Sequence, residues 1–215
     1  DDPGDPPEPL PGGAIVLDQV RVVDVSGVRE AAAVVLVADL IWDVLPAGGP
    51  FPGAAEVQVL PGVTVLPGLI DAHVHLTLSG ALGWVGPTLA ENLEAQLDWG
   101  GVGVADLGGP GSMVEVRRRL EEGSLRGPRL WATGPMLTAV GSHPCEAVVD
   151  EQMCRFVDGD GAAAVAELPG ADGRKIALAD AAFTPWPTPR LDLADLAEIT
   201  AAAGAAGQPV VAHVD

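Results

Sequence analysis

Two of the chain's four histidines, His73 and His75, stand one residue apart at the end of an apolar, strand-like run. Side chains at positions i and i+2 of a strand point to the same side, so both imidazoles can reach one point in space. Two converging imidazoles suit a transition metal, whereas a lone histidine on a strand is more often structural. The spacing of the two histidines, their position at the end of a strand and the neighbouring Asp71 all favour metal binding over a structural role, so the pattern predicts a metal site.

Lys175, the only lysine of the chain, lies in the semi-apolar segment 170–178. Lysines usually lie on solvated faces, so a single lysine in a semi-apolar segment indicates a chemical role. A metal would repel an ammonium group, but a deprotonated amine that takes up carbon dioxide becomes a carbamate, an anion with two oxygens. A carbamate on Lys175 could bridge two metal ions.

Three further polar residues stand at or after the ends of predicted strands: Asp106, His143 and His213. In parallel α/β barrels the working residues sit at the carboxyl ends of the strands. Taken alone, His213 would be read as a structural histidine, and His143 stands in a glycine-containing loop where it is either solvated or in contact with substrate. Lys175 and His143 are the candidate catalytic residues.

Two aspartates near these residues are expected to support the site rather than to bind metal. Asp71 is expected to cap or orient the segment that carries the histidine pair. Asp106 is expected to order its own loop by hydrogen bonds to the amides of Gly108 and Gly109.

The elements that must position these residues divide the chain into three parts. Residues 1–13, rich in Pro, Asp and Gly, predict a disordered acidic tail. Residues 14–65 predict the N-terminal part of a small β-sandwich domain, with β-branched runs at 14–17, 20–25, 33–37 and 57–60. Residues 66–215 alternate between short apolar strands and helical stretches, which favours a parallel sheet covered by helices.

The expected strands of the third part are 69–75, 102–107, 129–133, 175–178 and 209–214, and the expected helices are 88–99, 112–122, 161–168 and 191–206. About five strand-helix units are too few for a closed eight-stranded barrel, which typically needs about 250 residues. The sequence therefore predicts an α/β fold with an incomplete TIM-like (β/α)8 barrel after the small β-domain.

Charge and hydropathy exclude two classes of partner. The formal charge of −19 is spread along the chain and would repel nucleic acid and anionic lipid. No apolar run could cross a bilayer without interruption, so we expect no membrane contact. Cys145 and Cys154 fit either a loop disulfide or two separate thiols, and the compartment stays open, with the cytoplasm slightly favoured over secretion.

At these residues the chain resembles the metal-dependent amidohydrolase superfamily, particularly its Xaa-Pro dipeptidase-like, imidazolonepropionase-related branch. The resemblance implies that His73 and His75 hold the more buried metal, that a carboxylated Lys175 bridges two metals, and that His213 binds the second. The ions would commonly be zinc, although such donors also accept manganese, iron or cobalt. The matching segments are 67–75, 103–109, 127–130 with 134–135, 170–176 and 209–213.

The activity implied is metal-dependent hydrolysis of a C–N bond in a small-molecule or peptide substrate. The family pattern also includes a histidine on the sixth strand and an aspartate on the eighth; this chain has neither, and Asp215, directly after the fifth strand, is in the wrong place. We therefore expect an N-terminal fragment that is inactive alone. The alternatives are a non-catalytic barrel fragment that acts as a binding module, or half of a hydrolase completed by a missing C-terminal half, by another chain or in a homo-oligomer.

Overall fold

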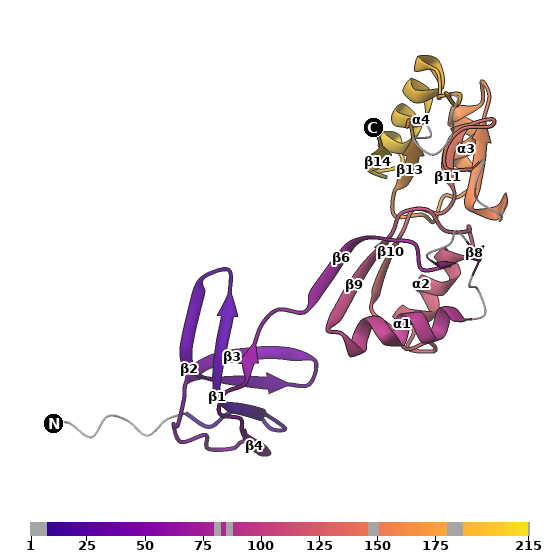
Figure 1. Cartoon of the computed structure of the whole chain (residues 1–215). Coiled ribbons are helices and arrows are strands. Elements are labelled where there is room, and N and C mark those ends of the chain that lie inside the picture. Colours follow the sequence, from indigo (N-terminus) through magenta and orange to yellow (C-terminus); the bar gives the residue numbers. More distant parts are fainter. Residues whose placement is uncertain (1–7, 80–82, 85–87, 146–150, 180–186, 215) are drawn as a thin grey trace. The chain divides into compact units, whose positions relative to one another are not determined.

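The computed structural model describes residues 8–79, 83–84, 88–145, 151–179 and 187–214. The chain forms two compact units, Asp1–Pro67 and Gly68–Asp215. In Figure 1 the first unit is coloured from indigo to purple and the second from magenta to yellow. In the described part of the chain, no helix is long and apolar enough to cross a membrane.

The first unit is one five-stranded sheet in the order β3-β2-β1-β4, with β5 also paired to β1. Strands β1, β2 and β3 are antiparallel neighbours, whereas β4 and β5 run parallel to β1. Val34 and Val35 of β2 point to opposite faces and join different buried apolar clusters, so both faces of the sheet are packed. The strands are β1 Ile15–Asp24, β2 Gly27–Val37, β3 Leu40–Pro46, β4 Glu56–Val59 and β5 Thr64–Val65.

This unit differs from the sequence prediction in two places. Strand β3 was not predicted, because most of its side chains are exposed and show no apolar alternation. The prediction of a disordered tail is wrong for residues 8–13, since the Leu10 amide donates a 2.8 Å hydrogen bond to the Pro52 carbonyl and its side chain packs against the sheet. Residues 1–7 of the predicted tail lie outside the described residues.

The second unit contains two parallel sheets, ordered β10-β9-β6 and β12-β11-β13-β14. Residues 133–135 alone separate β10 from β11, so one nearly continuous segment contributes a strand to each sheet. A short antiparallel pair, β7 Leu78–Ser79 and β8 Gly83–Trp84, stands apart from them. The parallel strands are β6 Leu69–Val74, β9 Gly101–Asp106, β10 Arg129–Ala132, β11 Met136–Ala139, β12 Cys154–Val157, β13 Arg174–Ala177 and β14 Val210–His213.

All five strands and four helices predicted for this unit are present, with ends within two residues of the prediction, which confirms the α/β class. Strand β11 was missed because it follows directly on Gly134-Pro135, a strong turn signal, and strand β12 was missed because Arg155 interrupts its short apolar run. The helices are α1 Leu89–Asp98, α2 Met113–Glu121, α3 Gly161–Ala166 and α4 Leu193–Ala205, with a short 3-10 turn η2 at Glu151–Met153.

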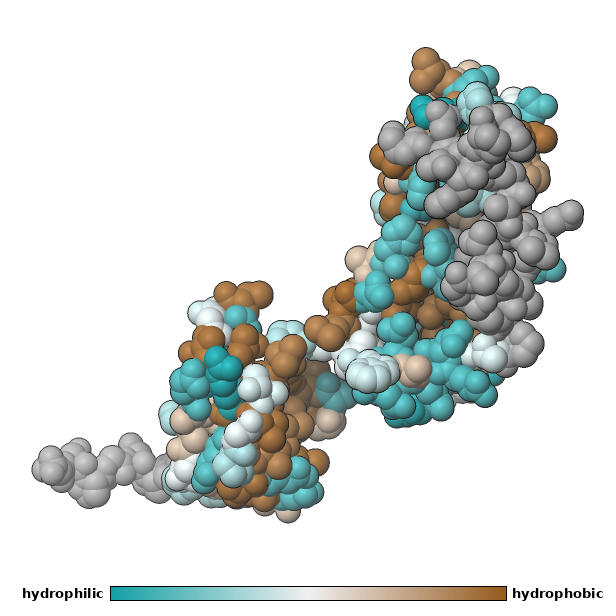
Figure 2. Space-filling model, in the orientation of Figure 1, coloured by the Kyte–Doolittle hydropathy of each residue, from teal (hydrophilic) through white to brown (hydrophobic). Residues whose placement is uncertain are grey.

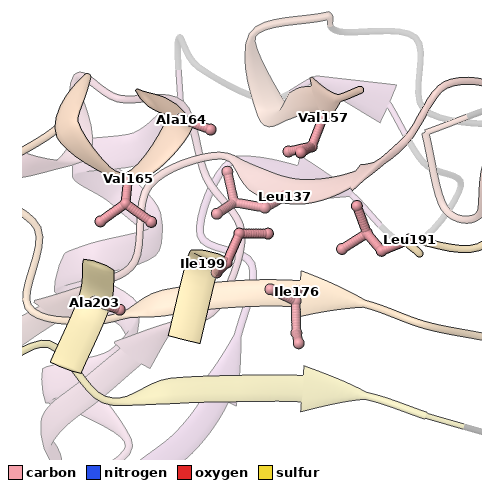
Figure 3. Close-up of a cluster of buried hydrophobic side chains, with 8 residues drawn as sticks. All are labelled: Leu137, Val157, Ala164, Val165, Ile176, Leu191, Ile199 and Ala203. Carbon is pink, nitrogen blue, oxygen red and sulfur yellow. The ribbon is translucent and has the colours of Figure 1, made fainter. Parts of the chain in front are cut away.

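Each sheet of the second unit packs its own helices through a buried apolar cluster. Leu93 of α1 and Met113 of α2 meet Val104 and Leu130 of the first sheet. Figure 3 shows the second cluster, where Ile176 of β13 packs with side chains of β11, α3 and α4. Because neighbouring strand residues face opposite sides, Ile176 in this core directs Lys175 away from these helices.

Apolar side chains also reach the surface at the sheet edges, as the brown areas of Figure 2 show. Trp42 of the edge strand β3 is 58% exposed and Val59 of the edge strand β4 is 55% exposed. In the second unit Ile70 of β6 is 74% exposed, and Val214, directly after β14, is 66% exposed. Exposed apolar edges of this kind can pair with further strands.

Candidate functional site

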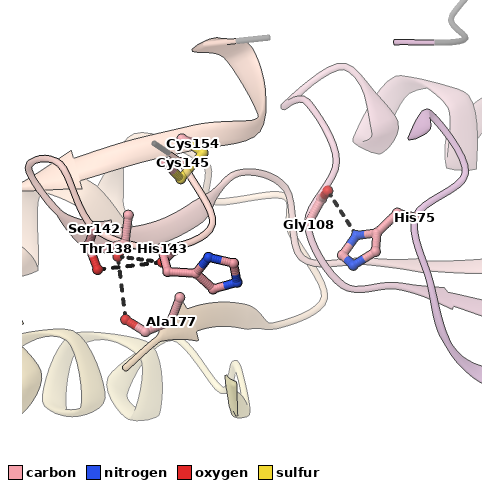
Figure 4. Close-up of a disulfide and its surroundings, with 8 residues drawn as sticks. All are labelled: His75, Gly108, Thr138, Ser142, His143, Cys145, Cys154 and Ala177. Carbon is pink, nitrogen blue, oxygen red and sulfur yellow. Dashed lines mark hydrogen bonds between the residues drawn. A yellow bond between two sulfur atoms is a disulfide. The ribbon is translucent and has the colours of Figure 1, made fainter. Parts of the chain in front are cut away.

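The histidine pair stands where the sequence predicts it. His73 lies in β6 and His75 directly follows that strand, with their ring centroids 5.4 Å apart and the rings edge to face. The Asp71 carboxylate accepts a 3.1 Å hydrogen bond from the His73 amide, which orders the backbone between them. Nδ1 of His75 lies 3.3 Å from the Gly108 carbonyl, an interaction drawn as a dashed line in Figure 4. A proton on Nδ1 satisfies that carbonyl and leaves Nε2 as a free ligand.

Burial lowers the pKa of both imidazoles. For His73 the nearby Lys175 lowers the pKa further, and Asp71 offsets part of the effect. For His75 the Gly108 carbonyl raises the pKa, while His73, Lys175 and His213 lower it. Both rings are therefore held in the neutral form, which is the form that binds a metal.

Lys175 is buried in β13, with 2% of its surface exposed. Among the described residues its amine makes neither a salt bridge nor a hydrogen bond, and burial lowers its pKa. The sheet pairs Ala177 with His213 on β14, and Ala177 faces the same side as Lys175. The buried amine and the imidazole that ends β14 therefore lie on one face of the sheet.

The loop after β11 brings His143 to His213, with ring centroids 5.7 Å apart. Thr138 of β11 holds this loop, because its hydroxyl lies 3.4 Å from the carbonyls of both His143 and Ala177 and shares its proton between them (Figure 4). A disulfide between Cys145 and Cys154 ties the same loop to the start of β12. The structure therefore pairs Cys145 with Cys154 in a disulfide, one of the two alternatives that the sequence left open. Nothing in the sequence indicated that Thr138 holds this loop.

Asp106 ends β9, as predicted, and is completely buried. Neither carboxylate oxygen has a hydrogen-bond partner of good geometry among the described residues, but the backbone amides of Leu76 and Gly108, the second of them expected from the sequence, lie close enough to stabilise its charged form. Burial raises its pKa to about 7, although the amides of Leu76 and Gly108 offset part of the rise. A Cβ on Gly109 would lie 2.9 Å from the carboxylate, so only glycine fits there.

The donors in this region have the right chemistry for a divalent metal but do not form a complete ligand set. Within the described ranges, no group of three or more His, Cys, Asp or Glu side chains is placed to hold a metal ion. Two imidazole pairs are present, and Lys175 is close enough to the first pair to lower the pKa of both rings. Neutral imidazoles and a readily deprotonated amine fit the metal that the sequence predicts.

Comparison with known proteins gives the following relatives. No family model matches the chain. A 72-residue stretch, 34% of this chain, is 39% identical to an allantoinase of Streptomyces avermitilis, of which it covers 16%. The fold matches a prolidase in complex with N-methylphosphonate-L-proline, at 27% identity and a TM-score of 0.76, and a Xaa-Pro dipeptidase with methionine in its active site, at 23% identity and 0.77.

Each of these two structures matches 94% of this chain, and the chain spans 56% and 57% of their length. The chain thus covers little more than half of the solved structures that it resembles. These comparisons confirm the resemblance to amidohydrolases and to Xaa-Pro dipeptidases that the sequence predicts.

Proposed function

We propose that this chain is part of a metal-dependent hydrolase of the amidohydrolase type that cleaves C–N bonds. Its metal ligands would be His73, His75, His213 and Lys175 in the carboxylated form. The expected metal is a pair of divalent ions, with zinc as the first candidate. The relatives named above, an allantoinase and a prolidase, support the general hydrolase class.

The buried amine of Lys175 is the observation that carries this proposal. A charged group that is 2% exposed and has no anionic partner in the described residues destabilises the fold unless it is neutralised. Burial lowers the pKa of this amine, which favours the uncharged form that reacts with carbon dioxide. Carboxylation would convert it into an anion beside neutral imidazoles, and this explains why a lysine occupies the position.

The other residues have separate roles in the proposed site. Divalent metal, when bound, supplies a hydroxide at neutral pH and polarises the substrate carbonyl. His75, oriented by the Gly108 carbonyl, and His73, ordered through Asp71, present their imidazoles from one strand end. His143 lies beside His213, and its proposed role is to contact the substrate.

The substrate class follows from the relatives and stays broad. The proposed substrate is a dipeptide or a cyclic amide, and among the relatives the prolidase was solved in complex with N-methylphosphonate-L-proline. Neither relative contributes enough identity over enough of its length to choose between them. The strongly negative chain favours a substrate without a high negative charge.

Completion of the site would come from further strands. In the described part of the second unit, β6 is one unpaired end of the first sheet and β14 is one unpaired end of the second, and exposed apolar side chains lie on β6 and directly after β14. The resemblance places a sixth-strand histidine and an eighth-strand aspartate beyond them, in a (β/α)8 barrel. We propose that a full barrel forms when these strands are supplied, and that the 215-residue chain alone binds metal weakly and hydrolyses nothing efficiently.

Metal content tests the proposal. Elemental mass spectrometry would compare the chain with its Lys175→Ala and His73→Ala variants, in buffer containing zinc and bicarbonate, with Arg126→Ala as a control because Arg126 is an exposed residue. We expect a small but measurable zinc content in the parent and in the control, and at least tenfold less zinc in both site variants. Equal zinc binding by all four proteins would contradict the assignment. A folded chain that never binds metal, even when extended by the missing strands, would favour the non-catalytic module.

A further inference from the structure

A cavity lies on the other side of β13 from Lys175. It has a volume of about 240 Å³, is partly open to solvent and is lined by residues of β11, β12, α3 and the start of β13, among them Leu137, Ala164, Arg155, Glu167 and Arg174. A water molecule in the liquid takes about 30 Å³, so the cavity has room for a small ion together with several waters. None of the proposed metal ligands lines it.

Arg174 is the unusual member of this lining. It is 1% exposed and is the largest fully buried side chain among the described residues. Ile176, two residues further along β13, packs in the core against α3 and α4, so Arg174 faces the same helix-covered side. An apolar residue would be expected at such a position, because arginine is almost never fully buried unless it is paired.

The partners of Arg174 satisfy only part of its guanidinium. Nη2 donates to the carbonyls of Val165 and Leu168, at the end of α3. Nε has no hydrogen-bond partner, and no carboxylate of the described chain forms a salt bridge with this residue. A six-residue helix offers only partial negative charge at its end, so a full positive charge stays buried without an anion.

The remaining charges of the cavity do not neutralise Arg174. Arg155 forms salt bridges with Glu167 and Asp160, each at 2.7 Å, so the carboxylate that lines the cavity is already engaged by the other arginine. Both nearby carboxylates, Glu167 and Asp160, are thus paired with Arg155, and Arg174 is left without an anionic partner among the described residues. Arginine remains charged at any physiological pH, so the unpaired charge of Arg174 persists.

We propose that this cavity binds a small oxyanion, for which inorganic phosphate is the probe, with Arg174 as the principal ligand and Arg155 at its side. Oxyanions are the ligands that guanidinium groups bind best in proteins. Because the whole chain carries a formal charge of −19, long-range attraction does not assist the anion, and binding depends on these local donors. The proposal is independent of the proposed hydrolase activity.

Phosphate binding to the chelator-treated 215-residue chain tests the proposal. Equilibrium dialysis with labelled phosphate is expected to show one saturable site, and phosphate is expected to raise the melting temperature. Arg174→Met should weaken binding at least tenfold and abolish the thermal shift, whereas Arg126→Met, an exposed control, should bind as the parent does. Lys175→Ala should also bind phosphate normally, which separates this cavity from the proposed metal site.

Two further measurements keep the test decisive if Arg174→Met fails to fold. Arg174→Lys keeps the charge but presents fewer donors, and Arg155→Met leaves Arg174 intact; both should weaken phosphate binding by a smaller factor. Acetate added as a competitor shows whether a carboxylate occupies the same site. Absence of saturable binding by the parent, or unchanged binding in the folded Arg174 variant, would overturn the proposal.

Discussion

At the scale of single residues, Lys175 titrates in a pH range in which no other side chain of this protein is expected to titrate. The chain has no tyrosine and no second lysine, and both cysteines form a disulfide. On the alkaline side, up to the ordinary lysine pKa of about 10.4, Lys175 is therefore the only side chain expected to lose a proton. Its folded-state pKa is lowered by burial, so the unfolded chain binds its proton more tightly than the folded chain in this range.

The free energy of unfolding should therefore rise with pH through this range in metal-free, carbon dioxide-free buffer, because stability increases wherever the unfolded state holds more protons. Each unit of pKa shift corresponds to about 1.4 kcal/mol. Lys175→Met should be more stable than the parent at pH 7 and should lose this dependence. Urea unfolding at a series of pH values measures both effects; a flat profile for the parent would show that its amine is not desolvated.

Asp106 gives the opposite pH dependence in a lower range. Its pKa is raised to about 7, so the folded chain holds this proton more tightly than the unfolded chain between about pH 4 and 7. The free energy of unfolding is therefore higher at low pH and falls as the pH rises, by roughly 4 kcal/mol for a pKa shift of this size.

Asp106→Asn mimics the protonated acid and should remove this dependence. We expect the variant to be more stable than the parent at pH 8 and about as stable at pH 4. His73 and His75 also have lowered pKa values, so the comparison must be made between the two proteins at each pH. A destabilised Asn variant at pH 8 would mean that the carboxylate is needed in its charged form.

At the scale of the elements, the disulfide holds together two strands and a loop. Cys145 belongs to the loop that carries His143, and Cys154 starts β12, which pairs with β11 on the loop's other side. In the chain-entropy model, a cross-link across a separation of nine residues stabilises the fold by about 2–3 kcal/mol. Its loss would also free the His143 loop from β12.

The variant with both Cys145→Ser and Cys154→Ser should therefore unfold at lower urea concentration than the parent. Adding dithiothreitol to the parent should reproduce this loss, whereas the double variant should not respond to the reductant. Urea unfolding followed by circular dichroism measures both. An unchanged midpoint after confirmed reduction would contradict a structural role for the bond.

The alternation of short apolar runs with helical stretches was enough to predict the elements that carry the candidate site. His73, Asp106 and His213 stand at strand ends because apolar runs end there, a feature that the sequence displays directly. The thiol pairing and the complete burial of Asp106 could not be predicted, because they depend on which loops and strands become neighbours. Strand β3 was missed because its stability comes from pairing with β2 rather than from its own apolar pattern.

At the scale of the whole molecule, the open ends of the sheets in the second unit are the dominant feature. Ile70 on β6 and Val214 after β14 are largely exposed beside backbone groups that no neighbouring strand pairs in the described part of the chain. Apolar edges of this kind favour association between copies when no further strands cover them. The same edges would be buried in the completed barrel of the proposed hydrolase.

The isolated chain should therefore self-associate in a concentration-dependent way, and a charge on an edge should suppress this. Ile70→Lys places a cation on β6, and Val25→Lys is a matched control, because Val25 is fully exposed in the turn between β1 and β2. Sedimentation velocity over a range of concentrations should show less association for Ile70→Lys than for the parent or the control. If the parent stays monomeric throughout, these edges are protected without further strands, and the need for a completed barrel loses its main structural support.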